Sequence, residues 1–269
     1  MIEHFVTAPQ WEWYIVWYFF LGGIAGGVYA LGAILRLMGD ERDAPIARLA
    51  FLLCLPILVI CPILLTLDLG RPLRFWHMLI DSRTFTLNFK YWSPMSVGVW
   101  VLLIFGVFAL ISFLEALANL RTGRAPFLVG GLGRAVVAVG AVFGLFLAGY
   151  TGVLLSVSNQ PVWSDTWALG ALFLASGLSV AAATLSLVSR LGRHERSAEA
   201  KLTRADRYFT VLELASHFFT AAMRVALTPP RGRVECAFSA QNKLCNESDC
   251  KFYPAVPPTR MEPRLAVVG

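Results

Sequence analysis

Residues 49–72 read LAFLLCLPILVICPILLTLDLGRP, and the interpretation of the whole chain starts from this stretch. The segment Leu49–Leu67 is apolar and uncharged. Its length is close to the ~20 residues that a helix needs to cross the ~30 Å hydrocarbon layer of a membrane. An acid, Asp68, and a base, Arg71, follow at once, and Pro72 cannot continue a helix. We therefore expect a membrane-spanning helix that ends in a short polar rim.

The rest of the sequence repeats this pattern of long uncharged runs. The chain is 57% hydrophobic and only 15% charged, whereas about a quarter of the residues of a soluble domain are charged. Because lipid offers no partner for open backbone groups, each run must be helical. We predict an all-α, polytopic transmembrane bundle with about six spans. Besides Leu49–Leu67, the candidates are Tyr14–Leu35, Tyr91–Leu114, Ala135–Ser164, Thr166–Ser189 and a shorter, more polar sixth run, Tyr208–Met223.

The distribution of basic residues predicts the orientation in the membrane. The loops after the first, third and fifth spans hold three, three and six Lys and Arg residues, whereas the loops on the other side hold four in all. The positive-inside rule then puts the N-terminus outside the cytoplasm. The net charge of +6 is thus a signal of topology in a cell (inner) membrane, and no nucleic-acid partner is predicted.

Two parts of the chain differ in character. Residues 1–223 hold all the spans, with a charged loop expected over residues 190–207. Residues 224–269 are polar and rich in proline, which is typical of an extended or disordered tail. Three cysteines in that tail do not have the spacing of common iron–sulfur or zinc sites, so no metal site is predicted. They are Cys236, Cys245 and Cys250.

Polar and aromatic clusters from four spans are expected at one end of the bundle. Because successive spans alternate in direction, the start of the first span, the Asp68–Arg71 rim, the segment 92–96 and the segment 150–163 all reach the outer face. This arrangement predicts a shallow site between helices. Two simpler interpretations stay open: Asp68 could form only an ion pair with Arg71, and Tyr150 could belong to the aromatic belt at the lipid interface.

Four motifs together resemble the NrfD/PsrC family, the membrane subunits of polysulfide, nitrite and related reductases. The resemblance covers roughly residues 10–220. It rests on Trp13-Tyr14 through Gly26-Gly27-Val28, on Leu67–Pro72 with Phe75-Trp76-His77, on Ser93-Pro94-Met95-Ser96, and on Gly149-Tyr150-Thr151-Gly152 with Asn159-Gln160-Pro161-Val162-Trp163. Family members usually have eight or more spans, so the segment from about Arg224 departs from their pattern.

The resemblance implies a subunit that exchanges electrons with the membrane quinone pool, with menaquinone or ubiquinone bound and no haem. Its implied partners are an extracytoplasmic, four-cluster ferredoxin-like iron–sulfur subunit and a catalytic reductase subunit, often a molybdopterin enzyme. By their positions in the motifs, Asp68 and Tyr150 are the implied catalytic residues. Tyr18 stands where some members have a histidine, and Arg71 and Asn159 complete the implied quinone contacts.

Other ionisable residues suggest further roles and other functions. Glu213, inside the sixth run, is a candidate for a proton path, because acids within spans are costly unless they serve a function. Glu115, near the end of the third span, is a second candidate, but the preferred interpretation of this residue is a buried pair or a side chain that extends to the membrane surface. Of the four histidines, two lie in polar segments, His77 lies at the rim and His217 in the sixth run, so a bis-histidine haem site is not expected. A transporter or channel, or a purely structural anchor, stays open as an alternative function.

Overall fold

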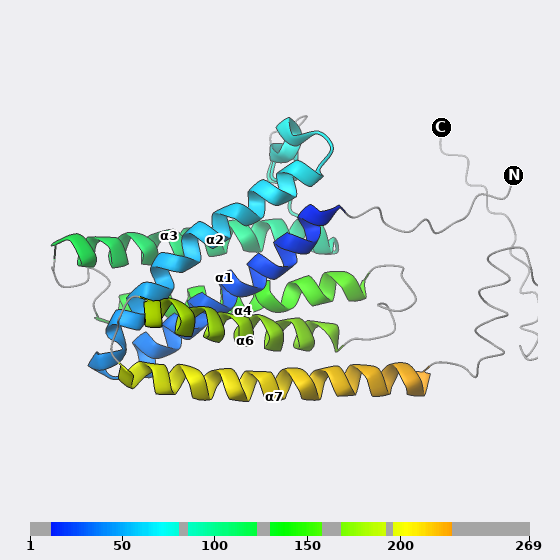
Figure 1. Cartoon of the computed structure of the whole chain (residues 1–269). Helices are drawn as coiled ribbons and strands as arrows, with labels where there is room; N and C mark the ends of the chain where they lie inside the picture. The colour runs from blue at the N-terminus through cyan, green and yellow to red at the C-terminus, as the bar shows by residue number, and fades with distance from the viewer. Residues whose placement is uncertain (1–11, 81–85, 123–129, 158–167, 192–195, 228–269) are drawn as a thin grey trace, which may run out of the picture. The chain divides into compact units, whose positions relative to one another are not determined.

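The computed structural model describes residues 12–80, 86–122, 130–157, 168–191 and 196–227 (Figure 1). The regular elements within these ranges are helices, joined by turns and irregular stretches such as residues 88–93; one isolated antiparallel bridge joins Ile80 and Leu87. The helices are α1 Trp13–Met38, α2 Ala44–Asp68, α3 Pro94–Thr122, α4 Gly130–Ser156, α6 Leu169–Leu191 and α7 Arg196–Leu227, with short 3₁₀ helices η1 Glu41–Asp43 and η2 Pro72–Met78.

Five of these helices, α1, α2, α3, α4 and α6, are long and apolar enough to cross a membrane. They correspond to the first five uncharged runs, which confirms the prediction of a polytopic helical bundle. The sixth run lies within α7, which is not among the five. Apolar side chains on α2 and α3, such as Ile63 and Val107, are about half exposed, as expected of surfaces that face lipid chains.

Helix α1 packs against α2, α4 and α6. Its residues from Gly22 to Ala33 are buried, because glycines along this stretch let the neighbouring backbones come close. A Cβ atom added at Gly27 would lie 2.7 Å from the carbonyl oxygen of Gly177 in α6. One added at Gly22 would have only an ordinary contact, at 3.8 Å from the Tyr18 ring.

We expect Gly27→Ala to destabilise the bundle by about 1–3 kcal/mol, since the added methyl group overlaps a packed backbone. The same substitution at Gly22 adds a methyl group where there is room, and it should be neutral or slightly stabilising because alanine favours helices. Thermal unfolding of the two purified variants in one detergent measures the difference. Equal stability would contradict the close packing of α1 against α6.

The predicted loop over residues 190–207 is wrong for most of its length, because α7 already begins at Arg196. Lys201 of α7 binds the connection between α1 and α2: its Nζ lies 2.7 Å from Asp43 Oδ2 and 2.9 Å from Asp40 Oδ2. The hydrogen bond to Asp43 is the main cause of a raised pKa for Lys201, and the bond from Lys201 lowers the pKa of Asp40. These ion pairs hold the start of α7, which is not one of the five membrane-spanning helices, against the α1–α2 connection. Helix α7 continues to Leu227 and so includes the first four residues of the predicted tail, 224–227; the rest of that tail, from residue 228 onward, lies outside the described residues.

Candidate functional site

One pocket of about 600 Å³ lies where α1 begins, α2 ends, α3 begins and α4 ends. We call it the rim pocket. It brings together Tyr18, Asp68 and Tyr150, which lie far apart in the sequence, as the alternating direction of the spans predicts. The remaining wall is mostly apolar and consists of Ile15, Phe19, Leu65, Leu69, Met78, Ser93, Pro94, Met95, Gly98, Val99, Leu154 and Val157.

Asp68 is the last residue of α2 and is half-buried in the wall of the rim pocket. No hydrogen bond or ion pair joins its carboxylate to another residue in the described ranges, Arg71 included. Asp68 is the only acidic residue among the described residues that line the pocket. A carboxylate with open lone pairs beside a mostly apolar pocket can accept a proton or a hydrogen bond from a ligand.

Tyr150 reaches the rim pocket from α4 and is only 6% exposed. Its hydroxyl donates a hydrogen bond to the carbonyl oxygen of Pro94, the first residue of α3. The ring fits there because residue 98 is glycine: a Cβ at Gly98 would lie 2.5 Å from the Tyr150 hydroxyl. With its proton directed at Pro94, the phenolic oxygen still has lone pairs that can accept a hydrogen bond.

Tyr18 differs from the other aromatic residues at the start of α1. Trp13 and Trp17 are 79% and 54% exposed, as in an interfacial belt, whereas Tyr18 is 3% exposed. Its side chain lines the rim pocket, yet its hydroxyl has no hydrogen-bond partner within the part of the chain that the structure describes. A phenolic hydroxyl can donate one hydrogen bond and accept others, so this group is available to a ligand in the pocket.

Two other predicted site residues in the described part of the chain, Arg71 and Glu213, do not line this pocket. Arg71 is exposed, precedes η2 and is not part of the pocket wall. Asn159 lies outside the described residues, as do Cys236, Cys245 and Cys250. Glu213 is half-buried on α7, away from the residues that line the rim pocket.

At the opposite end of the same helices, Glu115 is bound by Arg36. The two terminal guanidinium nitrogens, Nη1 and Nη2, donate to the carboxylate oxygens at 2.5 and 2.7 Å, and the Glu115 side chain is only 2% exposed. The interpretation of Glu115 as a buried ion pair is thus confirmed. The two residues line a separate pocket of about 420 Å³, together with Asp40, Arg48 and Asn119.

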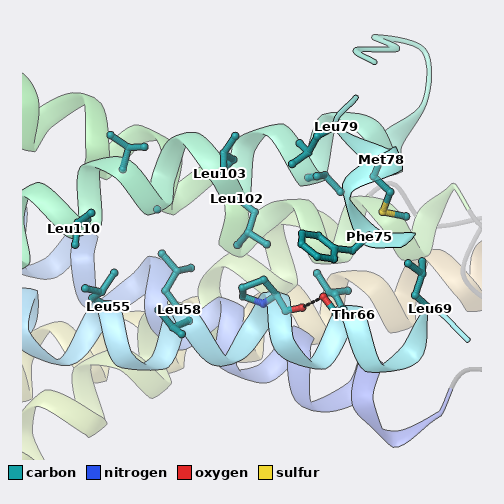
Figure 2. A pocket seen from close by; sticks show the side chains of 16 residues that line it. Leu55, Leu58, Thr66, Leu69, Phe75, Met78, Leu79, Leu102, Leu103 and Leu110 are labelled. Atoms are coloured by element: carbon teal, nitrogen blue, oxygen red, sulfur yellow. Dashed lines mark hydrogen bonds between the residues drawn. The ribbon is translucent and has the colours of Figure 1, made fainter. Parts of the chain in front are cut away.

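A second pocket next to the rim pocket was not predicted. This apolar pocket, of about 490 Å³, lies between α2 and α3, and η2 lies at one end of it (Figure 2). The two prolines within α2 suggest a kinked helix that shapes a cavity, and Pro62 lines the apolar pocket. The sequence does not show which helix lies opposite α2 across the pocket, because that depends on tertiary packing. Its wall consists of Leu55, Leu58, Val59, Pro62, Leu65, Thr66, Leu69, Phe75, Met78, Leu79, Val99, Leu102, Leu103, Gly106, Val107 and Leu110.

Comparison with known proteins gives consistent matches. The C subunit of the polysulfide reductase of Wolinella succinogenes is 30% identical over 189 residues, which cover 66% of this chain and 57% of that protein. The protein NrfD of Escherichia coli is 25% identical over 209 residues, covering 71% and 64%. An NrfD homolog of Haemophilus influenzae is 29% identical over 194 residues, covering 66% and 58%.

The matched region spans about six-tenths of the length of these relatives. The family described as "Polysulphide reductase, NrfD" matches residues 2–238, which include every helix described above. With its membrane-spanning helices and these relatives, the chain belongs to the NrfD family of membrane proteins.

Proposed function

We propose that the chain is the quinone-reactive membrane subunit of a reductase complex. It exchanges electrons between the membrane quinone pool and an extracytoplasmic iron–sulfur subunit of the four-cluster ferredoxin type, which connects to a catalytic subunit such as a molybdopterin reductase. Membership of the NrfD family and the likeness to the C subunit of a polysulfide reductase support this class. The observation that carries the proposal is the rim pocket, where two buried tyrosines meet an acid that is not paired with any described residue.

The chemistry of the rim pocket suits a quinone headgroup. Such a headgroup is a flat, mostly apolar ring with oxygen atoms at opposite edges, so it needs apolar walls and hydrogen-bonding groups on more than one side. The pocket is mostly apolar and has Tyr18, Asp68 and Tyr150 as polar groups from three different helices. Its volume of about 600 Å³ lies within the range of small-molecule sites, roughly 300–1,000 Å³.

These side chains can also handle the protons of quinol oxidation, which releases two electrons and two protons. The Asp68 carboxylate, which has no partner among the described residues, would accept a proton from one quinol hydroxyl. The phenolic oxygen of Tyr150 would accept a hydrogen bond from the other quinol hydroxyl, while its own O–H group still donates to the Pro94 carbonyl oxygen. The second proton would leave that quinol hydroxyl for water, and both electrons would pass to the iron–sulfur subunit. For the oxidised ring, the Tyr18 hydroxyl is a donor that no described residue engages.

Further parts of the proposal extend beyond the rim pocket. Arg71, which is exposed and outside the pocket wall, is proposed as a contact at the edge of the headgroup site, Asn159 as another contact, and Glu213 as a step in a proton path. The rim pocket is proposed to face the extracytoplasmic side. Large exposed apolar side chains at the same end of the bundle, Leu73 at 88%, Tyr91 at 76% and Trp92 at 66%, would suit contact with the iron–sulfur subunit or with lipid headgroups.

The substitution Tyr18→Phe tests the proposal with little structural disturbance. It removes a hydroxyl that has no hydrogen-bond partner within the described ranges, so stability should not fall, whereas a lost hydrogen bond to quinone should raise the KM for quinol about tenfold. The assay is quinol oxidation by the assembled complex in membranes, with unfolding followed in parallel.

The matched control is Tyr29→Phe, on the same helix. The Tyr29 hydroxyl lies 2.9 Å from Ser112 Oγ and is not part of the rim pocket, so its loss should lower stability by about 1 kcal/mol and leave KM unchanged. An unchanged KM in Tyr18→Phe would argue against a headgroup in this pocket. Transport without any quinol-dependent electron transfer would favour a transporter instead.

A further inference from the structure

The apolar pocket and the rim pocket share a wall. Leu65, Leu69, Met78 and Val99 line both. We infer that the apolar pocket holds the isoprenoid tail of the quinone whose headgroup lies in the rim pocket. The inference rests on the proposed function and adds to it a second binding region, which selects for quinones with a long tail.

The lining of the apolar pocket requires an apolar ligand. No residue in its described wall has an ionisable side chain. The one hydroxyl in this described wall, on Thr66, already donates to the carbonyl oxygen of Pro62 at 2.6 Å; Figure 2 marks this hydrogen bond with a dashed line at Thr66. A polar ligand would therefore lose its hydrogen bonds with water and gain none here. A hydrocarbon chain makes no hydrogen bonds with water and therefore loses none when it enters the pocket.

The shape of the apolar pocket fits a chain better than a ring. Its wall on α2 extends from Leu69 back to Leu55, a distance of about 21 Å at ~1.5 Å per residue. Figure 2 shows Leu69 and Met78 at one end of the pocket and Leu55 and Leu110 toward the other. The end at Leu69 adjoins Asp68, so a tail that leaves the rim pocket would run along α2 into the membrane-spanning part of the bundle.

A lipid acyl chain has the same chemistry, and the shared wall is the reason to prefer the quinone tail. A lipid would have to enter from the membrane with its headgroup outside. A quinone with its ring between Tyr18 and Asp68 already has its tail beside Leu65 and Leu69. One molecule can thus occupy both pockets.

The position of Gly106 offers a clean way to block the apolar pocket. A Cβ atom added there meets no heavy atom within 4 Å, so Gly106→Phe, or the smaller Gly106→Leu, would fill the pocket without a clash at the Cβ. Gly131→Phe is the matched control, because Gly131 also has open space around it but lies on α4, outside the pocket. Neither glycine belongs to the rim pocket.

The experiment uses three photoreactive probes on the assembled complex in membranes, with labelled peptides identified by mass spectrometry. One quinone carries a diazirine on its isoprenoid tail, another carries the reactive group on its ring, and a fatty acid carries the same diazirine as the tail. The tail probe should label residues 55–69 and 99–110 roughly tenfold more than the fatty acid does. Gly106→Phe should remove that labelling and leave ring labelling in place, whereas Gly131→Phe should change neither.

Two other results would overturn the inference, and they differ in what they leave standing. Equal labelling of the apolar pocket by the fatty acid and the tail probe would make it a lipid site, while the ring probe still supports the headgroup site. Failure of the ring probe to label the rim pocket in the unsubstituted chain would remove the proposed function, and the tail site with it.

Discussion

Replacing Asp68 with asparagine is expected to lower the rate of quinol oxidation by about 10²–10⁴-fold, the usual contribution of a positioned acid or base. Asparagine keeps the size of the side chain and can still hydrogen-bond, but it cannot take up the proton that a quinol hydroxyl must release. Because the carboxylate has no hydrogen bond or ion pair within the described chain, the substitution should leave folding intact. Quinol-dependent turnover in membranes measures the effect.

Two further variants separate the loss of proton transfer from damage to the protein. Asp68→Glu keeps a carboxylate and should retain a measurable part of the activity. Asp40→Asn makes the same chemical change at the other end of the bundle, where Lys201 still has Asp43 as a partner, and should leave turnover unchanged. If Asp68→Asn oxidised quinol within about twofold of the unsubstituted rate while its partner subunits co-purified, Asp68 would not be the proton acceptor.

Replacing Arg36 with leucine is expected to cause the largest loss of stability, about 3–5 kcal/mol. The substitution leaves the Glu115 carboxylate, 2% exposed, buried without its cation, and an unpaired buried charge is costly. Thermal unfolding and the yield of folded protein in detergent measure the loss.

The double variant Arg36→Leu/Glu115→Leu should recover most of that stability, since an apolar pair can replace a buried ion pair. Arg48→Leu serves as the control, because its guanidinium donates to the neutral Asn119 at 3.3 Å and should cost only about 1 kcal/mol. If the double variant were stable but lost quinol turnover, Glu115 would act in proton movement rather than only in the ion pair.

The membrane fold could be predicted because a single physical rule dominates it. A segment without charges that is long enough to cross the hydrocarbon layer has to be helical, and α1, α2, α3, α4 and α6 follow that rule. The rule fails at residues 196–207, where charge suggested a loop. There, Lys201 of α7 pairs with Asp40 and Asp43, and such partners cannot be identified from local sequence.

The site was predictable only in part. Alternation of the helices brings the ends of α1, α2 and α4 to one side, so Tyr18, Asp68 and Tyr150 could be expected to meet there. The sequence does not show which neighbouring side chains also face the pocket, because that depends on how each helix is rotated about its axis. Asp68 lines the rim pocket, whereas Arg71, three residues further along the chain, is exposed. A signal for Gly98 did exist, since it lies one helical turn after Pro94 and leaves room for the Tyr150 ring.

The apolar pocket could not be predicted for a related reason. Its residues are leucines, valines and other apolar side chains like those throughout the spans, and no pattern distinguishes a residue that lines a pocket from one that faces lipid. Leu58 is 3% exposed and its neighbour Val59 is 48% exposed, yet both line it. Only the packing of α2 against α3 and η2 separates this surface from the rest.

The central claim is that side chains from separate membrane-spanning helices form one binding site for a quinone ring. The most direct test is to crosslink a quinone with a photoreactive ring to the complex in membranes and to identify the labelled residues. We predict labels within residues 15–19, 94–99 and 150–157, three segments that contribute side chains to the rim pocket. These labels should be lost when unlabelled quinone is in excess. Labels confined to the pocket around Arg36 and Glu115, or spread evenly over lipid-facing surfaces, would contradict the claim.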